Sequence, residues 1–191
     1  MLMNTSWSAV GSLMGLFYFW MQVMVPCLPP APLSISHLNT DEYMGSWHLV
    51  AVSVWDEHDL RNYKYVDNSI LHIEKGDNDT LNVTEFYSIL GWCQKNAWTY
   101  DTSILEPFML RSDMDAFALV WDGKFVNCPS CIIMLHVDRK NKIRSTMLFD
   151  RGEKTPDEVI QKFKSKMECL YMKDFLKLPR EKAQCQIEAA A

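Results

Sequence analysis

Short hydrophobic runs, separated by polar turn residues, fill the chain between Trp47 and Asp150, and this pattern predicts β-strands. Eight runs are rich in aromatic and β-branched residues, and turn residues such as Gly91 and Asp122-Gly123 separate them. The runs cover residues 48–55, 69–75, 80–90, 97–104, 108–111, 117–121, 131–137 and 142–149. This spacing is typical of an all-β barrel or sandwich, and eight strands suit a small closed barrel. We therefore predict an all-β fold, an eight-stranded antiparallel up-and-down barrel.

One helix is predicted after the barrel. Residues 155–158 (Thr-Pro-Asp-Glu) have the form of a capping box with proline at the first helical position. Apolar residues then recur at helical spacing, at Ile160, Phe163, Met167 and Leu170. A single apolar stripe indicates a C-terminal helix that packs on the outside of the barrel.

The first 26 residues carry no charged side chain, and residues 10–25 are almost entirely apolar. This run is longer than the roughly 7–15 residues of a signal's hydrophobic region and shorter than the roughly 20 of a spanning helix. Its position ahead of a Pro-rich stretch favours a secretory signal, and a signal anchor is the alternative. Small residues in an A-x-A arrangement do not precede Pro26, so we predict that the segment is retained as an apolar anchor.

The chain divides into four predicted segments. These are a signal-like apolar segment at 1–26, a Pro-rich N-terminal segment at 27–44, the barrel at 45–151, and a helix with a disulfide-tied tail at 152–191. A length of 191 residues favours one domain. The formal net charge is −5, and acidic and basic residues are interspersed after residue 36, so no basic face is available for counterion release. We expect no nucleic-acid partner.

Six cysteines in a secretory context predict three disulfides, and the sequence alone leaves their pairing open. Asn78 and Asn82 each begin an Asn-x-Thr glycosylation motif. Cys128-Pro-Ser-Cys131 has the Cys-x-x-Cys spacing of redox enzymes, but a predicted strand follows it where a redox thiol needs a helix N-terminus. A structural disulfide, local or to another cysteine, is the favoured interpretation.

The sequence offers no catalytic or metal-binding pattern. The five histidines lack ligand spacing, and the chain contains neither a Gly-x-Ser-x-Gly elbow nor a Gly-rich phosphate loop. We therefore expect no enzyme, no metal and no cofactor.

A closed eight-stranded barrel can hold one small ligand, and inward residues alternate along each strand. Trp98 and Tyr100 share one face of a predicted strand, Met109 and Arg111 share a face of the next, and Arg144 begins the last. An arginine inside an apolar barrel must be paired, and an anionic head group is one such partner. Alternatively, Arg111 and Arg144 lie at the rim or face solvent.

Several residues carry a family resemblance. Gly45-Ser46-Trp47 opens the first strand and resembles the Gly-x-Trp signature of lipocalins, and Arg151 resembles the arginine that packs over that tryptophan in the family. The Thr-Asp-Tyr motif of typical lipocalins is not evident, which suggests an outlying member. Residues 156–169, residues 174–180 and Cys185 are similar to the apolipoprotein M family of lipocalins, as is the leader, and the likeness covers residues 26–187.

This resemblance implies a lipocalin carried on lipoprotein particles by a retained signal segment, with sphingosine 1-phosphate or related lipids in the barrel. Trp98 resembles the family's pocket tryptophan, Tyr100 the aromatic residue two positions on, and Arg111 a phosphate-binding arginine. Arg144 lies near a further basic position, whereas Asn96 stands where the family pattern has an arginine.

The same resemblance implies disulfides between Cys27 and Cys169 and between Cys93 and Cys185, which leaves Cys128 and Cys131 to each other.

We expect a secreted, glycosylated carrier of an amphipathic lipid that associates with lipoprotein particles. A plasma lipocalin for a toxin or xenobiotic is one alternative. A lipocalin-type isomerase is another, and it would require a free cysteine in the pocket.

Overall fold

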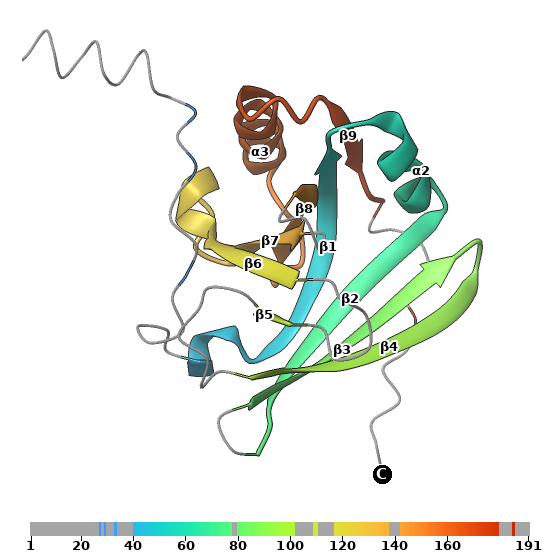
Figure 1. Ribbon diagram of the computed structural model, residues 1–191, viewed down its shortest axis with the longest axis vertical. Coiled ribbons are helices and arrows are strands. Elements are labelled where there is room, and N and C mark those ends of the chain that lie inside the picture. The colour runs from blue at the N-terminus through green and yellow to red at the C-terminus, as the bar shows by residue number, and fades with distance from the viewer. Residues whose placement is uncertain are drawn as a thin grey trace, which may run out of the picture.

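The computed structural model describes residues 27, 29, 33, 40–77, 80–101, 109–110, 117–137, 142–179 and 185. Nine antiparallel strands form one curved sheet (Figure 1). They are β1 (Gly45–Val54), β2 (Val66–Lys75), β3 (Thr80–Ile89), β4 (Trp92–Asp101), β5 (Met109–Leu110), β6 (Phe117–Asp122), β7 (Cys131–Val137), β8 (Ile143–Asp150) and β9 (Asp174–Lys177).

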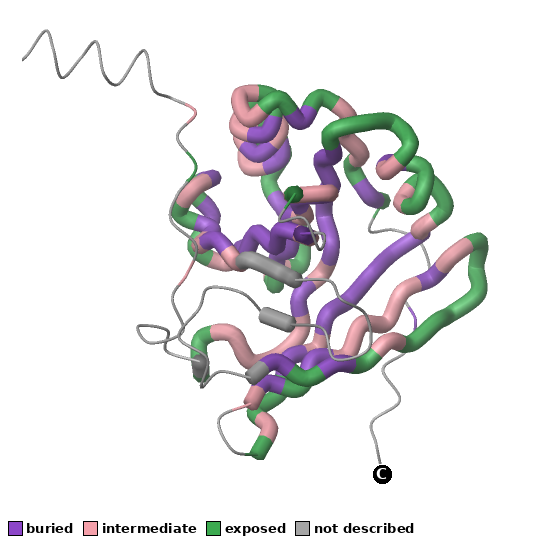
Figure 2. Tube along the Cα trace, in the orientation of Figure 1, coloured by how far each residue is buried: buried purple, intermediate pink, exposed green. Residues whose placement is uncertain are grey.

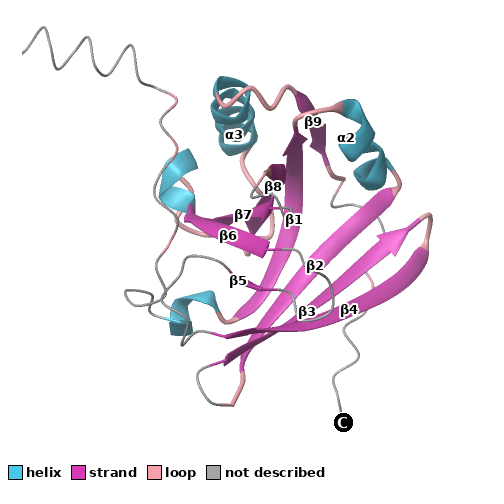
Figure 3. Cartoon of the chain, in the orientation of Figure 1, coloured by secondary structure: helices cyan, strands magenta, loops and turns pink. Residues whose placement is uncertain are grey.

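The first eight strands follow the order β4-β3-β2-β1-β8-β7-β6-β5, so every neighbour in the sheet except β1 and β8 is also a neighbour in sequence. The two edge strands, β4 and β5, also contact each other, so the sheet curves back on itself toward a closed barrel (Figure 3). This is the predicted eight-stranded antiparallel barrel. The strand β9 was not predicted, and it pairs with the second half of β1 at Ala51–Val54, where β2 has separated from β1.

The predicted start of β4 at residue 97 is wrong, because the strand begins at Trp92 and pairs with β3 along its whole length. The helix α2 (Glu57–Lys64) between β1 and β2 was also not predicted. Only Leu60 of this helix is buried, so it shows no apolar stripe. The features that favour this helix are local. The Asp56 side chain accepts a hydrogen bond from the Asp59 amide, and basic residues occupy the last turn.

The predicted helix is α3 (Asp157–Cys169), which lies outside the barrel with Ile160, Phe163 and Met167 buried. Its predicted capping box is wrong. The helix begins after Pro156 without a side-chain cap, because the Thr155 hydroxyl instead donates to the buried Asp150 carboxylate at 2.6 Å.

Two hydrophobic cores lie on opposite faces of the sheet. Figure 2 shows the buried residues along the strands and in α3. The inner core lies on the inner face of the barrel and includes Trp47, Leu71, Val83 and Phe149. The outer core lies between the sheet and α3 and includes Phe163, together with the short 3-10 helix η3 (Gly123–Val126). Within the residues that the structure describes, no helix is both long and apolar enough to span a membrane.

Candidate functional site

The barrel encloses a cavity of about 440 Å³, within the roughly 300–1,000 Å³ of small-molecule sites. Its walls come from β1, β2, β3, β4, β7, β8 and α2. Apolar side chains such as Leu71, Met134 and Phe149 make most of the wall. A cavity of this size is large enough for one small molecule.

Trp98 and Tyr100 of β4 both line the cavity and are buried. They occupy alternate positions on one strand, so their side chains leave the same face of the sheet. The two rings contact each other edge to face, with centroids 6.2 Å apart and planes at 84°. The structure thus brings together the aromatic pair that strand alternation predicted.

A polar cluster interrupts the apolar wall. The Ser69 hydroxyl donates to the Glu85 carboxylate at 2.9 Å, and Glu85 lies opposite Asn96 in the β3–β4 ladder. His136 of β7 also lines the cavity. Sequence reasoning missed Glu85 and His136, although strand parity could have found Glu85, which shares a face with the cavity-lining Tyr87 and Ile89. Lysine and arginine are absent from the described part of the lining.

Helix α2 lies over one end of the cavity and contributes Tyr63 to its wall. The Tyr63 hydroxyl is hydrogen-bonded to the Ser145 hydroxyl at 2.9 Å and lies 3.8 Å from the Met147 sulfur. Burial raises the pKa of Tyr63 above its ordinary value, with smaller contributions from the nearby Glu85 and Asp59 carboxylates, while the Ser145 hydrogen bond lowers it. The Tyr63 hydroxyl is therefore neutral and lies in the cavity wall beneath α2.

Arg144, a predicted ligand residue, lies outside the described lining of the cavity. Its guanidinium donates to the Asp59 carboxylate of α2 at 3.0 Å. Side chains alternate between the two faces along β8. Met147 and Phe149 face inward, so Arg144, an odd number of positions away from both, faces outward. Arg144 joins β8 to α2.

Two other predicted ligand residues cannot be placed against the cavity. Arg111 lies outside the described residues. Met109 begins β5, where it pairs with Ala118, and its side chain is not described. The apolar segment 1–26 and Asn78 also lie outside the described residues. Asn82 is exposed near the start of β3, and its side-chain oxygen accepts from the Thr99 hydroxyl at 3.1 Å.

The end of the barrel opposite α2 is closed by the predicted signature residues. The Arg151 guanidinium lies 3.9 Å from the centroid of the buried Trp47 ring and donates to the Glu42 carbonyl. The Trp47 indole donates to the Tyr43 carbonyl at 3.0 Å, and burial raises the pKa of Tyr43. Gly45 precedes this cluster with φ = 101°, a conformation that favours glycine.

Three disulfides join Cys27 to Cys169, Cys93 to Cys185 and Cys128 to Cys131, and these are the pairs that the family resemblance implied. All six cysteines are therefore bonded, so the free thiol that an isomerase would require is missing.

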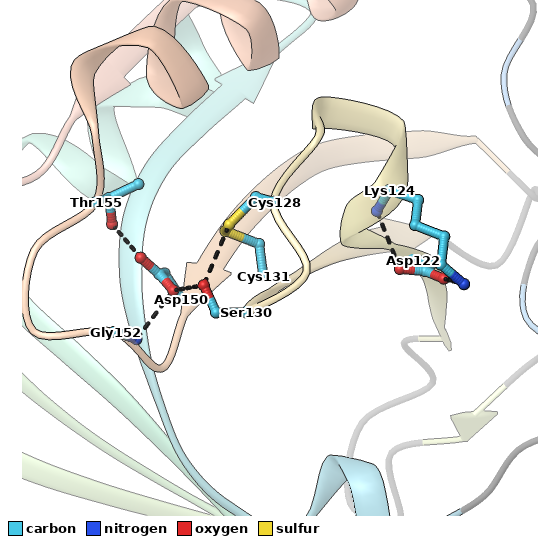
Figure 4. Close-up of a disulfide and its surroundings, with 8 residues drawn as sticks. All are labelled: Asp122, Lys124, Cys128, Ser130, Cys131, Asp150, Gly152 and Thr155. Atoms are coloured by element: carbon cyan, nitrogen blue, oxygen red, sulfur yellow. Dashed lines mark hydrogen bonds and ion pairs between the residues drawn. A yellow bond between two sulfur atoms is a disulfide. The ribbon is translucent and has the colours of Figure 1, made fainter.

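The short disulfide is buried beside Asp150 (Figure 4). The Asp150 carboxylate accepts from the Ser130 hydroxyl at 2.8 Å and from the Gly152 amide at 2.9 Å. These contacts connect the disulfide turn to the end of β8, which indicates a structural role.

A family model described as the ApoM domain matches residues 2–189 of the chain. The chain is similar to apolipoprotein M of Mus musculus, with 23% identity over 187 residues that cover 96% of this chain and 97% of the relative. Apolipoprotein M of Rattus norvegicus is also 23% identical, over 194 residues. The rat alignment covers 96% of this chain and 97% of that relative.

Solved structures share the fold. The siderocalin Ex-FABP, described as functioning through dual ligand specificities, superposes with a TM-score of 0.61 at 18% identity. That match covers 74% of this chain and 97% of the other. Siderocalin Q83, described as having a dual ligand binding mode, gives a TM-score of 0.54 at 19% identity, covering 78% of this chain and 96% of the other.

Proposed function

Since the chain belongs to the apolipoprotein M family of lipocalins, we propose that it is an extracellular carrier that binds an amphipathic lipid in the barrel. A lysolipid resembling sphingosine 1-phosphate or a fatty acid is the ligand class. The observation that carries this proposal is the cavity of about 440 Å³, which combines a largely apolar wall with a polar cluster around Glu85. An apolar tail and a polar head require this combination.

In this proposal the tail lies against Leu71, Met134 and Phe149, and the Trp98 ring contacts the ligand near its head group. Arg111 supplies the positive charge for an anionic head group through a charge-assisted hydrogen bond. Asn96 stands where the family pattern has an arginine, and Arg144 is bonded to Asp59. Arg111 is therefore the one arginine that we assign to the head group.

We further propose that the protein is secreted and remains on lipoprotein particles through residues 1–26. Three disulfides support an oxidising compartment. The intact mass of the secreted protein tests the retained segment. A chain that begins at Met1 is expected, and one that begins at residue 26 or later would contradict retention.

Organic extraction and mass spectrometry of the full-length protein from eukaryotic cells test the carrier function. A stoichiometric lysolipid or fatty acid is expected. A bound molecule that is not a lipid would instead support a plasma lipocalin for a toxin or xenobiotic. An isomerase is disfavoured because no cysteine is free.

A matched pair of tryptophan variants locates the ligand in solution. Trp98 lines the cavity, whereas Trp121 is buried in the outer core. We expect the fluorescence change on adding lysolipid to be lost in Trp98→Phe and retained in Trp121→Phe. A change that survives in Trp98→Phe would place the ligand elsewhere.

A further inference from the structure

The large exposed apolar side chains of the described residues all lie at one end of the barrel. We call this set the aromatic rim, and its members are Trp55 (47% exposed), Tyr65 (59%), Leu90 (69%), Trp92 (77%) and Tyr171 (73%). Trp55 follows β1 and Tyr65 precedes β2. Leu90 lies in the turn between β3 and β4, and Trp92 begins β4. Tyr171 precedes β9, which starts beside the end of β1. The β2–β3 and β3–β4 ladders bring Tyr65, Leu90 and Trp92 together. The β1–β9 ladder brings Trp55 to the segment that contains Tyr171, and α2 connects the two groups.

The aromatic rim adjoins the cavity and not the closed end. Val66 follows Tyr65 in the chain, Ile89 precedes Leu90, and both Val66 and Ile89 line the cavity. The opposite end carries the Trp47–Arg151 contact. The exposed apolar side chains therefore gather round the end of the barrel at which α2 covers the cavity.

Folding alone does not account for two members of the rim. Leu90 has φ = 52° and Tyr171 has φ = 63°, a left-handed conformation that favours glycine or asparagine. The third such position among the described non-glycine residues is Asn127, with φ = 58°, and it has the residue type that this conformation favours. Leu90 and Tyr171 thus combine a strained backbone with an exposed apolar side chain, so neither contributes as much to stability as glycine or asparagine would.

The rim is held in a fixed arrangement. The Gly91 amide donates to the Asp67 carboxylate at 2.7 Å, and the Leu90 amide donates to the Tyr65 carbonyl at 3.3 Å. These bonds fix the β3–β4 turn against the start of β2. Tyr65 and Leu90, two rim residues from different strand ends, are therefore neighbours in the folded protein.

A disulfide brings the N-terminal part of the chain to the same end. Cys27 directly follows the apolar segment 1–26, and it is bonded to Cys169, two residues before Tyr171. The segment that we propose as an anchor is thus attached beside the rim.

We propose that the aromatic rim docks on the surface of a phospholipid layer, so that the cavity mouth faces the layer and takes its ligand directly from it. Tryptophan and tyrosine favour the membrane interface, because each ring has an apolar body and a polar edge. Around α2 the three carboxylates Asp56, Glu57 and Asp59 are balanced by the three bases Arg61, Lys64 and Arg144, the last of which is bonded to Asp59, so this region has no excess of positive charge. This balance favours zwitterionic over anionic head groups. The proposal depends on the proposed function only in that the ligand is a lipid.

The test is the rate at which full-length protein takes up a fluorescent lysolipid from phosphatidylcholine vesicles. The double variant Leu90→Asn/Tyr171→Gly removes two rim side chains and relieves strain, so it should fold at least as stably as the wild type. Asn127→Gly is the matched control, because it changes the same kind of backbone position directly after η3, away from the rim. Affinity for monomeric lysolipid, measured without vesicles, monitors the cavity separately.

We expect the double variant to take up lysolipid about tenfold more slowly or worse, since each side chain contributes apolar area to docking. Asn127→Gly should keep the wild-type rate, and all three proteins should keep the same affinity for monomeric ligand. Equal rates in the double variant and the wild type would overturn the docking surface. A rate that requires anionic lipid would also overturn it, by assigning the contact to basic residues. If the wild-type protein does not bind monomeric lysolipid at all, the proposed function is refuted instead.

A second measurement uses vesicles of brominated phosphatidylcholine, which quench tryptophan on contact. Trp92→Phe should remove part of the quenching that the full-length protein shows. Quenching that is the same in the variant and the wild type would show that Trp92 does not reach the layer.

Discussion

Replacement of Arg151 by methionine should destabilise the protein by about 2 kcal/mol, because Arg151 makes two contacts at the closed end. Its guanidinium lies 3.9 Å from the centroid of Trp47, which is only 2% exposed. A cation–π contact contributes about 0.5–1 kcal/mol at exposed sites and about 2 when desolvated. Arg151 is itself exposed, so we take about 1 kcal/mol for this contact. The hydrogen bond to the Glu42 carbonyl adds a similar amount, about 1 kcal/mol.

Thermal unfolding monitored by circular dichroism, with the disulfides intact, measures this loss. A destabilisation of about 2 kcal/mol lowers the Tm of a chain this size by about 4–8 °C. Arg151→Lys should lose about half as much, because lysine keeps the charge but not the planar contact. Lys164→Met is the matched control, since the Lys164 ammonium lies 5.7 Å from the Phe175 centroid at an exposed site. If Arg151→Met unfolds at the same temperature as Lys164→Met, the reasoning is wrong.

Four further predictions follow from other contacts. Arg111→Ala should weaken lysophospholipid binding about tenfold or more, whereas Arg144→Ala should leave it unchanged; equilibrium titration separates the two. Tyr63→Phe should cost about 1 kcal/mol in urea unfolding and flatten the alkaline limb of the stability profile. Because burial raises the pKa of Tyr63, its contribution to stability is complete below pH about 10 and is lost as pH rises through that raised pKa. Gly123→Ala should cost several kcal/mol or prevent secretion, because a Cβ atom there would collide with the carbonyl oxygens of Cys128 and Cys131. Removing the disulfide between Cys93 and Cys185, 92 residues apart, should lower the Tm more than removing the one between Cys128 and Cys131, three residues apart.

The barrel could be predicted from sequence because its strands are short runs rich in apolar and β-branched residues that turn residues separate. β7 runs from Cys131 to Val137, as predicted, since nearly every residue in it is buried and apolar. The first half of β4 was missed because residues 92–96 read Trp-Cys-Gln-Lys-Asn, which lacks a hydrophobic alternation. Pairing with β3, a long-range contact, makes that segment a strand.

The candidate site was only partly predictable. Alternation put Trp98 and Tyr100 on one face, but it could not say which face of β8 carried Arg144, because a shift of one residue reverses the orientation of every side chain. Glu85 and His136 lie on strands far apart in sequence, and only the closed sheet brings both to one cavity. Thr155 was assigned to the helix because its local pattern fitted a cap, whereas a buried carboxylate five residues earlier competes for its hydroxyl.

The separation of the two cores has a consequence for how this scaffold can change. The outer core, with α3 and the Cys128–Cys131 disulfide, does not border the cavity. Its contribution to stability is therefore independent of which side chains face the ligand. Mutations at Glu85, Asn96 or His136 can alter what the cavity accepts while the packing beneath α3 keeps the sheet folded. Such a division allows the binding preference to diverge quickly among descendants of one ancestral barrel, and it makes the cavity suitable for redesign.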